Sequence, residues 1–184
     1  MKKIILSTLF LISVFSCKKE SAKTEYGMAV QDSASLPEPA KATAALKTFT
    51  AEQTSEFLGK KNDTLYVTNF FATWCGPCVK EIPHFKNKIQ ELNGKPVKIT
   101  FVSVDSKEDW NTKVPHFVDE QGIRNNTVLL DGQLLGADFF AANFKKWDGG
   151  AIPFTFMRKG DKTDETLGMI SEEQLNEKIA SLLK

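Results

Sequence analysis

Cysteine and histidine are scarce in this 184-residue chain, which has three cysteines and two histidines. Three cysteines are too few for the several bridges of a small disulfide-stabilised domain. The 24 basic and 23 acidic residues leave a formal net charge of +1 and form no block of one sign. Charge therefore gives no reason to expect a nucleic-acid partner. The 41% of hydrophobic residues suffices for one well-filled core rather than two.

The N-terminus has an apolar run that is too short to span a bilayer. Residues 4–15 are apolar and uncharged and follow Lys2 and Lys3, which is typical of a secretory signal. The next residues end in Ser16 and Cys17, and residues 14–17 resemble the lipobox of bacterial lipoproteins. This resemblance implies that residues 1–16 are removed and that Cys17 is acylated, which would hold the protein at a membrane of the cell envelope, outside the cytoplasm. The alternative is an ordinary secretory signal with Cys17 near its cleavage point.

Acylation of Cys17 would leave Cys75 and Cys78 as the remaining cysteines. The two are so close in sequence that they can hardly serve as a long-loop structural bridge. Their spacing therefore indicates chemistry rather than stabilisation.

Composition divides the mature chain into two parts. Residues 17–45 are mainly Lys, Glu, Ser, Ala, Thr and Pro without a sustained period, which predicts a lipidated N-terminus and a flexible tether. Residues 46–184 alternate between strand-like and helix-like runs, which predicts one domain.

The order of these runs predicts the fold class. Strands are expected at residues 64–72, 97–104 and 127–130, and a hairpin at 153–157 and 165–170 around the turn at 159–161. Helices are expected from the capping box of Thr50 and Gln53 to residue 58, at 79–92, from a cap at 106–109 to 118, at 137–147, and after a cap formed by Ser171 and Gln174. Such βαβ units followed by a hairpin and a helix predict an α/β fold with a central mixed sheet flanked by helices.

The cysteine pair lies where the first long predicted strand meets a helix. Cys75 is placed at the helix N-terminus, where unpaired amides and the helix dipole stabilise a thiolate. Gly76 permits close approach of another chain, and Pro77 suits the first helical turn. Cys78 lies one turn further in, so we expect Cys75 to be the nucleophile and Cys78 the protected partner of one redox-active disulfide.

Residues 69–78 read Asn-Phe-Phe-Ala-Thr-Trp-Cys-Gly-Pro-Cys and resemble the active-site strand and loop of the thioredoxin superfamily. With the lipobox, the tether and residues 78–83, the chain is similar to the TlpA/ResA-like membrane-anchored thiol-disulfide oxidoreductases. The resemblance implies a thioredoxin fold with an inserted βα segment, for which residues 105–131 are the candidates. Such an insert either shapes partner choice or covers a sheet edge.

The resemblance also assigns roles to individual residues. Asn69 stands where thioredoxin has a buried carboxylate, and Glu81 matches an acidic residue of the TlpA/ResA-like group that could receive the proton of Cys78. The alternative is that Glu81 is exposed and complements the helix dipole. Pro153 matches a cis proline that faces the dithiol, with the Ile152 backbone binding a substrate peptide; Pro153 could otherwise simply begin a strand.

Two further residues are candidates for the substrate site. Trp74 and Ile152 would form apolar walls beside Gly76 and Pro77, although each could equally belong to the core.

The function implied is reduction of disulfides in exported proteins, among them apocytochrome c in cytochrome c biogenesis, with electrons from a membrane dithiol donor. The Gly-Pro dipeptide and Ile152 resemble those of thioredoxin, which implies a potential near its value of about −270 mV rather than the strongly oxidising value of about −120 mV. No cofactor or metal is required, because the electrons reside on sulfur. The competing hypothesis is a binding module such as a metallochaperone, with Cys75, Cys78, His84 and His116 as conceivable ligands.

Overall fold

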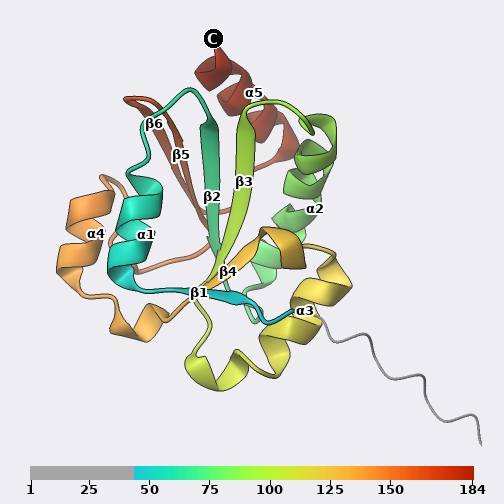
Figure 1. Ribbon diagram of the computed structural model, residues 1–184, viewed down its shortest axis with the longest axis vertical. Helices are drawn as coiled ribbons and strands as arrows, with labels where there is room; N and C mark the ends of the chain where they lie inside the picture. The colour runs from blue at the N-terminus through green and yellow to red at the C-terminus, as the bar shows by residue number, and fades with distance from the viewer. Residues whose placement is uncertain (1–43) are drawn as a thin grey trace, which may run out of the picture. The chain divides into compact units, whose positions relative to one another are not determined.

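The computed structural model describes residues 44–184, drawn in colour in Figure 1. The predicted signal, Cys17 and all but the last two residues of the predicted tether lie outside the described residues. The elements in chain order are β1 (Lys47–Phe49), α1 (Ala51–Leu58), β2 (Leu65–Phe71), α2 (Gly76–Glu91), β3 (Val97–Ser103), α3 (Lys113–Gln121), β4 (Thr127–Leu130), α4 (Ala137–Asn143), β5 (Phe154–Lys159), β6 (Lys162–Leu167) and α5 (Glu172–Leu183). Within residues 44–184 no helix combines the length and the apolar character that crossing a bilayer would require.

The strands form one mixed sheet in the order β1-β4-β3-β2-β5-β6. The β1, β4, β3 and β2 strands run parallel to one another, whereas β5 and β6 are antiparallel to their neighbours. Helices α1 and α4 lie together on one side of the sheet and α2, α3 and α5 on the other (Figure 1). The predicted α/β class with a mixed sheet flanked by helices is confirmed.

Local sequence signals account for most boundaries. The capping boxes of Thr50 with Gln53 and of Ser171 with Gln174 both form, and they begin α1 and α5. Strand β2 is apolar almost throughout, and six of its seven residues are buried because it lies inside the sheet with helices over both faces.

Three predicted elements differ from the structure. The segment after Ser106 forms only a 3₁₀ turn without a side-chain cap, and α3 begins later, at Lys113. Helix α4 ends at Asn143 rather than at residue 147, and β5 and β6 meet at a tighter turn than expected, around Gly160. The short strand β1 was not predicted, because its three residues gain strand structure only by pairing with β4.

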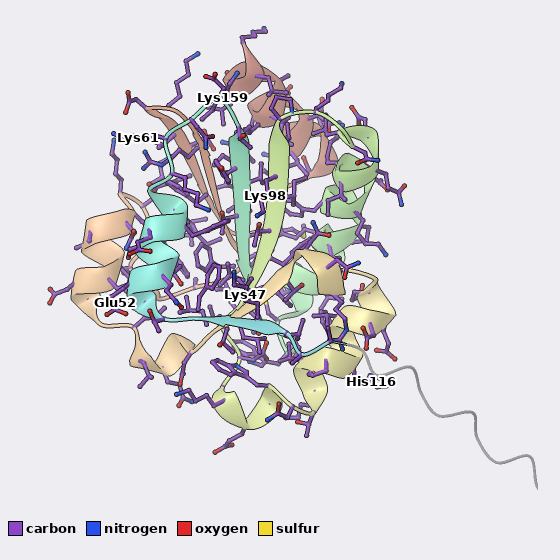
Figure 2. All side chains as sticks on the ribbon, in the orientation of Figure 1. Lys47, Glu52, Lys61, Lys98, His116 and Lys159 are labelled. Atoms are coloured by element: carbon purple, nitrogen blue, oxygen red, sulfur yellow. A yellow bond between two sulfur atoms is a disulfide. The ribbon has the colours of Figure 1, made fainter. Side chains whose placement is uncertain are left out.

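The core has two parts, one on each face of the sheet. One contains Val67 and Phe71 of β2 with residues of α2, α3 and α5. The other is largely aromatic and is built from Phe57, Phe70, Phe144, Trp147, Phe154 and Phe156 with aliphatic neighbours. The labelled side chains of Glu52, Lys61 and His116 lie on the outside of the domain (Figure 2).

The segment at residues 105–131 contains α3 and β4, as the inserted segment was expected to contain a strand and a helix. Strand β4 lies between β1 and β3, so the edge on this side of the sheet is β1. The segment therefore extends the sheet from within and does not simply cover its edge.

Candidate active site

The two cysteines form a disulfide at the start of α2, with their Cα atoms 5.3 Å apart. Cys75 is the N-cap of α2, and its sulfur accepts a hydrogen bond from the backbone N–H of Cys78 at 3.3 Å. Such a donor, together with the positive end of the helix dipole, stabilises a negative charge on the Cys75 sulfur. Cys75 is 5% exposed and Cys78 is fully buried, so the two sulfurs differ in access from solvent as expected.

The chain before β5 lies against the outer sulfur. The Ile152–Pro153 peptide bond is cis, as the family resemblance predicts, and Pro153 is buried. The Cys75 sulfur lies 3.7 Å from the carbonyl oxygen of Ile152. The indole N–H of Trp147 donates to the carbonyl oxygen of Ala151 at 2.7 Å, which ties this loop to the aromatic part of the core.

A groove of about 590 Å³ lies beside Trp74, the residue that precedes Cys75 of the disulfide. Trp74 and Ile152 line one part of it, and Phe140, Trp147 and residues 149–151 line another. Trp74 is 72% exposed, so it belongs to the surface and not to the core, while Ile152 is half-buried and packs against both core clusters. Gly76 and Pro77 are exposed beside them, so a substrate can approach the outer cysteine, Cys75, from this side, whereas Cys78 is fully buried.

Residues between β3 and β4 and in the turn after β4 also line the groove. Ser106, Asp109 and Gln133 supply its polar groups. The insert thus borders the surface next to the cysteines.

Glu81 is fully buried, so the alternative of an exposed side chain on the helix surface is wrong. Its Oε1 atom accepts from the Asn69 amide at 2.7 Å, and its Oε2 atom accepts from the Ile170 backbone N–H at 2.7 Å. Burial raises the pKa of Glu81 to about 7, because desolvation of the carboxylate outweighs the opposing effect of these two hydrogen bonds. Glu81 can therefore exchange a proton near neutral pH.

Asn69 joins β2, α2 and β5 at this place. Its side-chain nitrogen donates to Glu81 and, at 3.1 Å, to the hydroxyl of Thr155. Its side-chain oxygen is buried and has no hydrogen-bond partner among the described residues. Sequence reasoning noticed Asn69 only as a missing carboxylate and did not predict that it would bind Glu81.

Asp105 was missed as a residue that positions the site. Its buried carboxylate accepts from the backbone N–H and the hydroxyl of Thr73, and from the hydroxyl of Ser103. Thr73 lies two residues before Cys75, so Asp105 fixes the loop that carries the outer cysteine. The available signal was an acidic residue directly after a buried strand, on the edge where the active-site loop also begins.

The two histidines lie apart from the cysteine pair. His84 contacts the carbonyl oxygen of Ile170 with its Nδ1 atom at 3.1 Å, and His116 pairs with Glu120 on the exposed side of α3. Within residues 44–184 no three His, Cys, Asp or Glu side chains are grouped so as to hold a metal ion.

Comparison with known protein families gives a match over residues 36–163 to the AhpC/TSA family. The chain belongs to the AhpC/TSA family. This AhpC/TSA chain is 27% identical over 116 residues to the thiol-disulfide oxidoreductase ResA of Bacillus anthracis, a match that covers 63% of the chain and 60% of ResA. It is also 27% identical over 139 residues to the thioredoxin-like protein YneN of Bacillus subtilis, covering 73% of the chain and 74% of YneN. The expected resemblance to ResA-like oxidoreductases is confirmed, although the chain spans only 60% of the length of that ResA.

Solved structures show the same fold. A thiol:disulfide interchange protein of the thioredoxin family from Chlorobium tepidum superposes with a TM-score of 0.54 at 23% identity, covering 71% of this AhpC/TSA chain and 85% of the other. A thiol-disulfide isomerase from Corynebacterium glutamicum also gives 0.54 at 15% identity, with 67% and 82% covered. The fold of this family member is therefore thioredoxin-like, as predicted.

Proposed function

We propose that the chain is a thiol-disulfide oxidoreductase that reduces disulfides of proteins outside the cytoplasm. The observation that carries this proposal is the Cys75–Cys78 disulfide at the N-terminus of α2, with the outer sulfur capping the helix and facing Ile152. The ResA-like relatives support the same activity.

In the proposed reaction, the Cys75 thiolate attacks a substrate disulfide. A mixed disulfide forms between Cys75 and one substrate sulfur, and the other substrate sulfur leaves as a thiolate. Cys78 loses its proton, attacks the Cys75 sulfur, and releases the second substrate thiolate. Two electrons have then passed from the protein to the substrate, and a dithiol donor restores both cysteines.

Glu81 is the proposed acceptor of the Cys78 proton. It lies three residues after Cys78 on the same helix, so both side chains lie on one face of α2, and both are fully buried. A carboxyl group with a pKa near 7 can take a proton from a thiol and return it near neutral pH. If Glu81→Gln leaves the pH profile of disulfide reduction unchanged, this role is wrong.

The groove beside Trp74 is the proposed binding site for the substrate segment that flanks the reactive cysteine. Gly76, Pro77 and the Ile152 backbone would contact that segment closest to the sulfurs, and Pro153 would pack beside them. Because the groove is mainly apolar with a few polar groups on one wall, it suits an extended peptide with apolar side chains.

Location and partners are also part of the proposal. Acylation of Cys17 would anchor the protein at a membrane of the cell envelope, with residues 17–45 as a tether and residues 46–184 as the thioredoxin-like domain. Oxidised exported proteins, apocytochrome c among them, would be its substrates, and a membrane dithiol carrier its electron donor. Labelling with a radioactive fatty acid, with Cys17→Ser as the control, tests the anchor.

Reduction of insulin disulfides tests the activity, with Cys75→Ser as the inactive control. Cys78→Ser should accumulate mixed disulfides with partners, because the nucleophile remains and the second sulfur is lost. Equilibration with glutathione should give a potential closer to about −270 mV than to about −120 mV. A chain that fails to reduce insulin but carries stoichiometric metal after purification would instead be a metallochaperone.

A further inference from the structure

Only the nitrogen of the Asn69 side-chain amide makes hydrogen bonds; its oxygen makes none with the described residues. Asn69 lies on β2 between Val67 and Phe71, whose side chains are on the sheet face covered by α2. Its nitrogen donates to Glu81 and Thr155, and its oxygen is buried without a partner among the described residues. A buried acceptor without a donor is unfavourable, so this arrangement needs a reason.

The ionised state of Glu81 supplies that reason. A carboxylate can only accept hydrogen bonds, so the amide must turn its NH₂ group toward Glu81. A protonated Glu81 instead presents an O–H donor, which the NH₂ group cannot accept. The oxygen of Asn69 can accept it if the amide rotates by half a turn about its last side-chain bond.

Thr155 fits both orientations. Its hydroxyl accepts from the Asn69 nitrogen in the orientation observed, and it can donate to the Asn69 oxygen in the other because a hydroxyl is both donor and acceptor. One end of the amide lacks a partner in either orientation. The number of unsatisfied groups is therefore the same in the two orientations of the Asn69 amide, and the presence or absence of the proton on Glu81 determines which orientation is favoured.

We propose that the side-chain amide of Asn69 turns by half a turn each time Glu81 gains or loses a proton. Asn69 is then a positioning residue that keeps Glu81 hydrogen-bonded in both protonation states. The inference rests on the proposed function, since a proton that moves between Cys78 and Glu81 is what the turning amide would follow.

Few other groups near Glu81 titrate. At the start of α2 they are the N-cap Cys75 and Cys78 when reduced, and further along α2 lies His84, which contacts the carbonyl oxygen of Ile170, the residue whose N–H binds Glu81. Lys88 of the same helix pairs with Glu91, and Glu172 of α5 accepts from Asn87. Strands β2 and β5 present Asn69 and Thr155 to Glu81, and neither side chain titrates.

The test is an NMR titration of the ¹⁵N-labelled full chain in its disulfide form, in which the cysteines cannot titrate. The Asn69 side-chain amide signals, assigned by their loss in Asn69→Leu, are followed from about pH 5 to about pH 9, a range that brackets the pKa of Glu81. We expect both amide protons to shift with one midpoint near that pKa and to stay constant in Glu81→Gln. A midpoint that persists in Glu81→Gln overturns the inference, and so do Asn69 amide signals that do not move.

The reduced protein supplies the functional readout. We expect Asn69→Leu, which removes the donor to ionised Glu81, to move the midpoint of the pH profile of insulin reduction upward by about one unit. Thr100→Val, at a buried threonine of β3 outside this cluster, is the matched control and should leave the midpoint in place. An unmoved midpoint in Asn69→Leu overturns the inference while insulin reduction by the wild type still stands. Absence of insulin reduction in the wild type overturns the proposed function, and the titration still tests whether the Asn69 amide responds to the proton on Glu81.

Discussion

The two faces of the sheet come from the same strands and both bury apolar side chains, but only the face toward α2 also buries a polar cluster beside the cysteines. On the face toward α1 and α4, rings pack on rings: Phe144 lies between 5.0 and 5.7 Å from Phe70, Trp147, Phe154 and Phe156, measured between ring centres. On the face toward α2, Asn69, Thr155 and Glu81 form a buried polar cluster within a core that contains both aliphatic and phenylalanine side chains. Neighbouring residues of one strand therefore belong to different environments: Asn69 is part of the polar cluster, and Phe70 packs among the aromatic rings.

This difference indicates a division of labour. Apolar burial is favourable without any partner of defined geometry, whereas a buried carboxyl group is costly unless it is hydrogen-bonded. Apolar packing on both faces therefore supplies stability, and the polar cluster offsets part of that stability to hold the buried carboxyl group of Glu81 on the same face of α2 as Cys78. Substitutions on the two faces should differ in what they change.

The largest effect is expected on the aromatic face. Phe156→Ala removes a ring that is 2% exposed and should lower the free energy of unfolding by about 3–5 kcal/mol, measured by denaturant titration. The pH profile of insulin reduction should be unchanged in the molecules that remain folded. A shifted profile would show that the two faces are not independent.

Glu81 should make stability depend on pH. Its pKa in the folded protein, about 7, is above its usual value of 4.5, so the folded state binds more protons than the unfolded state between these values. Wild-type stability, relative to Glu81→Gln, should therefore be highest below about pH 4.5 and should fall by about 3 kcal/mol as the pH rises to about 7. Denaturant titrations of the wild type and of Glu81→Gln, each with the disulfide formed, measure the difference in free energy of unfolding across this pH range. A difference that does not change with pH would contradict a raised pKa of Glu81.

Glu165 is a buried polar residue on the otherwise aromatic face. Its substitution should lower the free energy of unfolding less than Phe156→Ala does. This largely buried carboxylate of β6 accepts from the backbone N–H groups of Lys145 and Lys146, just before Trp147. Glu165→Gln should lower the free energy of unfolding by about 1–3 kcal/mol, because the amide cannot accept all of these bonds equally. The exposed Asp161→Asn, which loses only a surface ion pair with Lys61, is the control and should leave the free energy of unfolding almost unchanged.

The two capping boxes give the smallest and most closely matched comparison. Thr50→Ala in α1 and Ser171→Ala in α5 should each cost about 1 kcal/mol in thermal or chemical unfolding, because each removes an N-cap acceptor. Ser171 directly follows Ile170, whose N–H binds Glu81, so only Ser171→Ala should also move the pH midpoint of insulin reduction. Equal pH midpoints in the two variants would show that the β6–α5 loop keeps Ile170 in position for Glu81 even without the Ser171 cap of α5.

Features set by neighbouring residues could be predicted from the sequence. The capping boxes, the long strands and the cysteine pair at a helix start all depend on nearby side chains, and the structure contains each of them. The false extension of α3 toward Ser106 arose because a run of capping-type residues was interpreted without knowing that Asp105, next to it, turns inward to hold Thr73.

Features that depend on long-range contacts could not be derived from one sequence. Whether Glu81 was buried or exposed depended on what covered that side of α2, and Ile170, which binds it, lies 89 residues away. Asn69 binds Thr155 across 86 residues for the same reason. The cis bond at Pro153 was expected only from the family resemblance, because most X-Pro bonds are trans.

The role of the Cys75 sulfur as the cap of α2 has a consequence for protein engineering and for evolution. Serine is among the preferred N-cap residues, and cysteine is not. Compared with the reduced wild type, Cys75→Ser should therefore have a more stable N-terminus of α2 but no activity. Selection for stability alone would favour serine at this position. The thiol at this position therefore provides reactivity at the expense of a more stable helix start.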